Sequence, residues 1–175
     1  AQAIAQNAPN PARAIDAWTR FERVSAEPPS RASLATLEAL TRDHPEGYVF
    51  VTGYARALAA LGRHAEAARV LKAAVVRFPQ DAPLFHDLAV AAREAGDTTE
   101  ALTAEQAALA LDDTYAAAHH GLALLHADAG RLGDALGPFA RAVELDPTNA
   151  AYWADLGNAY RDDGDVQQAD TAYGR

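Results

Sequence analysis

Residues 150–175 read AAYWADLGNAYRDDGDVQQADTAYGR, and this stretch carries the pattern that predicts the fold. Trp153, Leu156 and Tyr160 recur at the three- and four-residue spacing of one helix face. Gly164 follows this run and separates it from a second run of helix-compatible residues. Glycine readily adopts the left-handed conformation that ends a helix. The stretch therefore predicts two helices joined by a tight turn at Gly164.

The turn glycine recurs at a constant spacing of 34 residues. It occupies four positions: Gly62, Gly96, Gly130 and Gly164. An alanine follows each of these glycines five residues later: Ala67, Ala101, Ala135 and Ala169. Units of this length cannot bury an apolar face alone, so they stack on their neighbours. The period predicts an all-α array of antiparallel helix pairs.

The last copy resembles the tetratricopeptide repeat family, whose pattern is W-x2-L-G-x2-Y, then A-x3-F, then P. The matching residues are Trp153, Leu156, Gly157, Tyr160, Ala169 and Tyr173. The resemblance implies a right-handed α-solenoid whose first helices line a concave groove.

The motif divides the chain into segments with defined borders. We expect a linker or the remnant of a preceding repeat at 1–13, and a degenerate helix pair at 14–47, broken at Pro28-Pro29. Three repeats follow at 48–81, 82–115 and 116–149, and a truncated repeat occupies 150–175. Because the first residue is not Met and the last helix pair is incomplete, we expect the native protein to be longer.

Composition narrows the classes of partner. Forty-five residues are alanine, so the core is expected to consist of small side chains. The net charge of −9 disfavours nucleic acid and anionic membranes as partners. No apolar run approaches the roughly 20 residues of a membrane-spanning helix. Fourteen arginines against one lysine favour a bacterial gene, and both cytoplasm and periplasm stay open.

No recognised catalytic motif is present. G-x-S-x-G, H-E-x-x-H, G-x-x-x-x-G-K and G-x-G-x-x-G are all missing, so we expect no enzyme activity and no cofactor. The absence of cysteine excludes disulfides and thiolate metal sites. His119 and His126 fall at packing positions of the family pattern and lie roughly 10 Å apart along a helix, so we expect no metal site there. The acidic run Asp162–Asp165 lacks the closing Glu of a calcium loop and is interpreted as a turn.

The resemblance places polar side chains on the groove face of the first helices. We predict seven groove contacts: His86, Asp87, Glu94, His120, Asp128, Asp155 and Asn158. Small pockets are expected over Gly53 and Gly121. The acidic row favours a basic or amphipathic peptide segment.

The favoured function is that of a protein–protein interaction scaffold that binds a peptide or a partner surface. One alternative is the non-catalytic arm of a larger enzyme, such as a glycosyltransferase or a hydrolase. Another is a self-assembling structural scaffold, with self-association through the truncated C-terminal repeat.

Overall fold

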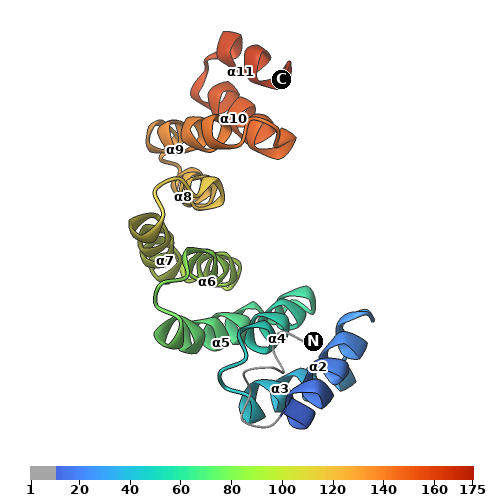
Figure 1. Ribbon diagram of the computed structural model, residues 1–175. Coiled ribbons are helices and arrows are strands. Elements are labelled where there is room, and N and C mark those ends of the chain that lie inside the picture. The colour runs from blue at the N-terminus through green and yellow to red at the C-terminus, as the bar shows by residue number, and fades with distance from the viewer. Residues whose placement is uncertain (1–10) are drawn as a thin grey trace. The chain divides into compact units, whose positions relative to one another are not determined.

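The computed structural model describes residues 11–175, and all regular structure in this range is α-helical (Figure 1). The helices are α2 (Pro11–Ser25), α3 (Arg31–Asp43), α4 (Tyr48–Ala60), α5 (His64–Arg77), α6 (Ala82–Glu94), α7 (Thr98–Leu111), α8 (Ala116–Asp128), α9 (Leu132–Leu145), α10 (Ala150–Asp163) and α11 (Val166–Tyr173). The chain forms two compact units, residues 1–74 (unit 1) and 75–175 (unit 2), with the border inside α5.

Unit 1 begins with the helix pair that the sequence presents as degenerate. Helix α2 packs on α3, and α3 packs on α4. Helix α2 starts at Pro11, three residues before the predicted border, because proline is well tolerated at the first helical position. Ser30 caps α3 in a reciprocal pair of hydrogen bonds with Ser33. Of the predicted segment 1–13, residues 1–10 lie outside the described residues, and 11–13 belong to α2.

Unit 2 is a row of helix pairs. Helices α6 and α7, α8 and α9, and α10 and α11 pack against each other within pairs. Successive pairs meet where α7 contacts α8 and where α9 contacts α10. The first helices of the four repeats begin 34 residues apart: Tyr48, Ala82, Ala116 and Ala150.

Alanine fills the positions where helices approach closely. The alanines five residues after the turn glycines are at most 2% exposed: Ala67, Ala101, Ala135 and Ala169. A second row is fully buried: Ala74, Ala108 and Ala142. Larger groups, such as Phe139 and Leu156, fill the remaining space in unit 2. The expected core of small side chains is confirmed.

The turns between paired helices share a backbone conformation but differ in their side-chain chemistry. The four turn glycines have φ between 71° and 92°, the left-handed region. After two of them, Asp97 and Asp165 cap the second helix by accepting a backbone N–H bond. The residue after the other two is an arginine that pairs with an acid three residues later.

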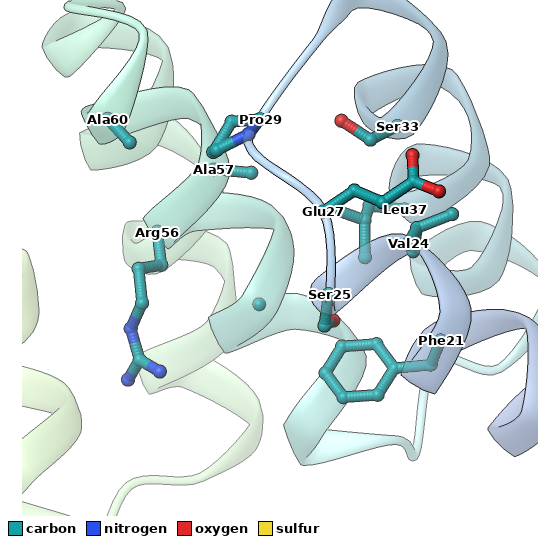
Figure 2. A pocket seen from close by; sticks show the side chains of 11 residues that line it. Phe21, Val24, Ser25, Glu27, Pro29, Ser33, Leu37, Arg56, Ala57 and Ala60 are labelled. Carbon is teal, nitrogen blue, oxygen red and sulfur yellow. The ribbon is translucent and has the colours of Figure 1, made fainter.

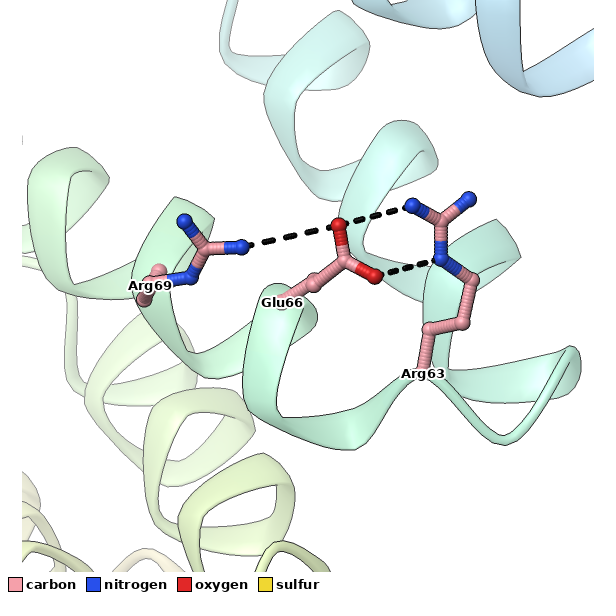
Figure 3. A network of polar contacts seen from close by, with 3 residues as sticks. All are labelled: Arg63, Glu66 and Arg69. Atoms are coloured by element: carbon pink, nitrogen blue, oxygen red, sulfur yellow. Dashed lines mark hydrogen bonds and ion pairs between the residues drawn. The ribbon is translucent and has the colours of Figure 1, made fainter.

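Figure 3 shows one of these arginine pairs at the start of α5. Arg63 donates from Nε to Oε1 of Glu66 at 2.6 Å and from Nη2 to Oε2 at 2.7 Å. Arg69 approaches the same carboxylate at 3.5 Å. Arg131 and Asp134 are the corresponding pair in unit 2, at 3.6 Å. An aspartate cap and an arginine–acid ion pair thus occupy equivalent places in the repeat.

Two ring nitrogens make the same contact at the start of neighbouring first helices. Nε1 of Trp153 donates to the carbonyl of Pro147 at 3.0 Å. Nε2 of His119 lies 2.9 Å from the carbonyl of Asp113, also six residues earlier. The imidazole of His119 therefore takes the place of the indole in the family pattern.

We expect Gly96→Ala to lower the free energy of unfolding by about 1 kcal/mol, because an L side chain is strained at its φ of +85°. Urea unfolding followed by circular dichroism measures the loss. The control is Gly133→Ala within α9, where an added Cβ meets no neighbour and helix propensity should improve stability slightly. Equal effects of the two substitutions would contradict the assignment of strain to the turn.

Candidate functional site

The candidate site is the face of unit 2 formed by the first helices α6, α8 and α10, here called the first-helix face. It carries the seven predicted contact residues together with other polar and apolar side chains of the same helices: Val90, Arg93, Leu124, Arg161 and Asp162. Contacts between α6 and α8, and a hydrogen bond from α8 to α10, make it continuous across the three helices.

The imidazole ring of His86 contacts a buried carboxylate. Its Nδ1 lies 2.9 Å from Oε1 and 3.2 Å from Oε2 of Glu105 on α7. Glu105 is 1% exposed, and Gly121 on α8 is the residue that leaves room for it. A Cβ at Gly121 would collide with the Glu105 carboxylate. Three helices therefore meet at this pair.

Burial and pairing act on the two groups in opposite senses. Burial raises the pKa of the Glu105 carboxyl, and this outweighs the lowering effect of His86. Burial lowers the pKa of the His86 ring, but the hydrogen bond and charge of Glu105 outweigh it, so this pKa lies above its usual value. Both groups bind protons more tightly in the folded protein than in the unfolded chain.

His120 repeats the arrangement with a partner from the next repeat. Its Nε2 lies 2.8 Å from Oδ2 of Asp155 on α10. The ring also packs on Tyr152, with centroids 4.6 Å apart. The side chain of Asp155 is 35% exposed, so the His120–Asp155 pair is much more accessible to solvent than the His86–Glu105 pair.

Most of the remaining predicted contact residues form hydrogen bonds with other side chains of the protein. Nε of Arg93 donates to Oδ2 of Asp128 at 2.7 Å, and its Nη1 donates to Glu94 at 3.2 Å. Tyr173 donates its hydroxyl hydrogen to Oδ1 of Asn158 at 2.9 Å. Asp87 is half-buried and raises the pKa of neighbouring His86. The seven residues thus lie on one face, and their roles as contacts stay a prediction.

The two expected pockets have different outcomes. The space over Gly121 is occupied by the carboxylate of Glu105, so the pocket expected there is wrong. Gly53 lines a cavity in unit 1 (Figure 2). A Cβ at Gly53 would meet the ring of Phe21, so the space directly over this glycine is also occupied, and both residues line the cavity.

Sequence reasoning did not single out Glu105 as part of the site. The available signal was its place in the repeat, where the other three copies carry Leu71, Phe139 and Tyr173. An acid at a position that is otherwise apolar indicates a buried partner, here His86.

Among residues 11–175, no group of three or more His, Asp or Glu side chains is arranged to hold a metal ion. Within the same residues, no helix is both long and apolar enough to cross a membrane.

Stacked helix pairs of constant length define a helical-repeat solenoid, a class of fold that serves as a scaffold. The chain belongs to the tetratricopeptide repeat family: one model of that family matches residues 30–82 and 86–150, and a second matches 139–171. As a member of this family, the chain is a protein-interaction scaffold. No curated protein sequence matches it.

Solved structures support the same fold at low sequence identity. The MamA protein (residues 41 to end) from Desulfovibrio magneticus has a TM-score of 0.75 and 20% identity, and 91% of this chain matches 92% of that one. A thermophilic TPR protein from Thermus thermophilus has a TM-score of 0.69 and 22% identity, with 91% of this chain and 83% of that chain covered.

Proposed function

We propose that the first-helix face of unit 2 binds a basic or amphipathic segment of a partner protein. The observation that carries this proposal is the charge of the unit. Residues 75–175 contain six Lys and Arg against seventeen Asp and Glu, a net charge of −11. Residues 1–74 contain nine against seven, a net charge of +2. A basic segment is therefore attracted to unit 2 in preference to unit 1.

The first-helix face keeps an acidic excess after its internal pairs are formed. It carries five carboxylates: Asp87, Glu94, Asp128, Asp155 and Asp162. Two arginines pair with three of them: Arg93 contacts both Glu94 and Asp128, and Arg161 contacts Asp162 at 2.9 Å. Because these pairs are largely exposed, an incoming cation can share the carboxylates without the cost of breaking a buried ion pair.

An apolar stripe supplies the second half of the recognition. Val90 on α6 is 42% exposed, and Leu124 follows 34 residues later at the equivalent place on α8. Val90 and Leu124 hold the ninth position of their repeats, between the histidines at the fifth position and the Arg93–Asp128 pair at the twelfth and thirteenth; the last repeat has Asn158 at the ninth position. A segment with apolar side chains and flanking Lys or Arg complements this order of surfaces.

The test is peptide binding by fluorescence anisotropy, with an amphipathic basic peptide and the same peptide with every Lys replaced by Glu. We expect the basic peptide to bind, and Asp87→Lys with Asp155→Lys to weaken binding by roughly tenfold or more. The control is Asp134→Lys with Asp170→Lys, which makes the same change of charge on α9 and α11. It should weaken peptide binding by less than about threefold.

Equal binding of the acidic peptide would overturn the preference for basic partners. Equal weakening by both pairs of substitutions would show that only the net charge of the unit matters, and would overturn the assignment to the first-helix face.

A further inference from the structure

The junction between α7 and α8 contains an ionisable side chain at a place where the other repeats have an apolar or aromatic one. Glu105 on α7 is 1% exposed, and the equivalent residues are Leu71, Phe139 and Tyr173. At the next junction, Phe139 on α9 is 2% exposed and packs in an apolar cluster with Leu156 on α10. The two junctions of unit 2 therefore share a place in the repeat but differ in chemistry.

Three helices surround the Glu105 carboxylate and give it a single partner. From α6, Nδ1 of His86 lies 2.9 Å from Oε1 and 3.2 Å from Oε2. From α8, Gly121 contributes no side chain, and the carboxylate occupies the place where its Cβ would be. Among residues 11–175, His86 is the only hydrogen-bond partner of this carboxylate. Compensation of its charge thus depends on the proton of one imidazole ring.

Few other charges act on this pair. Burial lowers the pKa of the His86 ring, but the hydrogen bond and charge of Glu105 and the charge of Asp87 raise it more. Burial raises the pKa of Glu105, and His86 lowers it to a smaller extent. From the start of α8, the ring of Tyr115 meets His86 edge-on, with centroids 5.6 Å apart. Within the described part of the chain, no arginine or lysine acts on either group, so no second cation is at hand to replace the imidazolium.

Loss of the proton of His86 leaves a buried carboxylate without a positive partner. A buried charge in this state is strongly unfavourable, so the protein has to bring water to it. The side chain of Glu105 is only 2% exposed, so hydration requires a movement of the surrounding helices. The wall with the least bulk is α8, because Gly121 faces the carboxylate without a side chain.

We propose that the His86–Glu105 pair is a pH-sensitive latch: it holds α8 against α7 while the imidazole ring is protonated, and the junction opens when that proton is lost. The opening hydrates the Glu105 carboxylate and leaves the helices themselves intact. The junction between α9 and α10 has no such pair, so it stays closed. This inference goes beyond the function proposed for the first-helix face and does not rest on it.

The test measures the separation of the helix pairs directly. Because the chain has no cysteine, spin labels can be attached to cysteines introduced at three exposed, equivalent positions, Thr99 on α7, Gly133 on α9 and Gln167 on α11. Electron–electron double resonance then gives the distance from 99 to 133 across the latch, and from 133 to 167 across the apolar junction. Between about pH 6 and about pH 9, the first distance should lengthen by roughly 3 Å, the space of one water layer, and the second should not change.

Variants separate the latch from other effects of pH. Glu105→Gln keeps the shape of the side chain but cannot carry its charge, so the distance from 99 to 133 should stay short throughout. If that variant fails to fold, Glu105→Leu is used, because the first repeat has Leu71 at the equivalent place. The matched control is Asp155→Asn, which removes the charge of the other histidine-paired acid and should leave the response to pH unchanged.

Four results would overturn the proposal. The first is a constant distance from 99 to 133, and the second is equal lengthening of both distances, which would indicate a general expansion of the acidic unit. The third is an unchanged response in Glu105→Gln, which would assign it to another group. The fourth is a loss of helical circular dichroism that accompanies the lengthening, which would indicate unfolding instead of the opening of one junction.

Discussion

Replacing Glu105 by alanine is expected to lower the free energy of unfolding by about 3 kcal/mol. The substitution removes a fully buried side chain, so it leaves a cavity between α6, α7 and α8. It also leaves Nδ1 of His86, which is 17% exposed as a side chain, without its carboxylate partner. Urea unfolding monitored by circular dichroism measures the loss.

The matched control for Glu105→Ala is Asp155→Ala. Asp155 also pairs with a histidine, at 2.8 Å, but its side chain is 35% exposed. Water can replace the carboxylate there, so the loss should be under about 1 kcal/mol. Equal losses from the two substitutions would show that burial does not determine the strength of these pairs.

The cost of Glu105→Ala should also depend on pH. The raised pKa of His86 contributes stability that is fully present below its ordinary value of 6.5 and is lost as pH rises through the raised value. The raised pKa of Glu105 acts in the same direction from its ordinary value of 4.5 upwards. The difference in the free energy of unfolding between wild type and variant should therefore narrow as the pH rises above about 4.5, and narrow further above about 6.5; a widening difference would contradict the pKa directions.

Gly121→Ala is expected to lower the free energy of unfolding in the wild type and to raise it in the Glu105→Ala variant. In the wild type, the new methyl group forces the Glu105 carboxylate away from His86, and stability should fall by about 2 kcal/mol. In the Glu105→Ala background that obstacle is gone, and the better helix propensity of alanine should raise stability by about 1 kcal/mol. The four proteins form a double-mutant cycle, measured by urea unfolding.

The control for this cycle is Gly133→Ala on α9, which has no neighbour within reach of a Cβ. Its effect should be the same with and without Glu105. Additive behaviour of Gly121→Ala would show that the Glu105 carboxylate moves aside at little cost, so that Gly121 does not hold the buried pair in place.

The repeat architecture could be predicted because it depends on local rules repeated at a constant distance. Gly62, Gly96 and Gly130 each need only a left-handed φ, which glycine adopts whatever surrounds it. The buried alanines follow from the same spacing. Helix α2 begins earlier than expected, because proline at its first position is compatible with a longer helix.

The candidate site was less predictable, because repeat position indicates which face a side chain is on and not what it touches. His86 and His120 share the fifth position, yet one pairs within its own repeat and the other with the next. The reason is the residue at the sixth position of the following repeat. It is Asp155 for His120, but for His86 it is Gly121, which has no side chain.

The sequence by itself determined the helices, their pairing, the alanine core and membership in the tetratricopeptide repeat family. These features arise from backbone preferences and apolar periodicity, which act within one unit or between neighbours. Only the tertiary structure decided that the Glu105 carboxylate fills the space over Gly121, while the ring of Phe21 lies over Gly53. That outcome depends on volume and on the cost of burying a charge, and both are set by side chains that three different helices bring together.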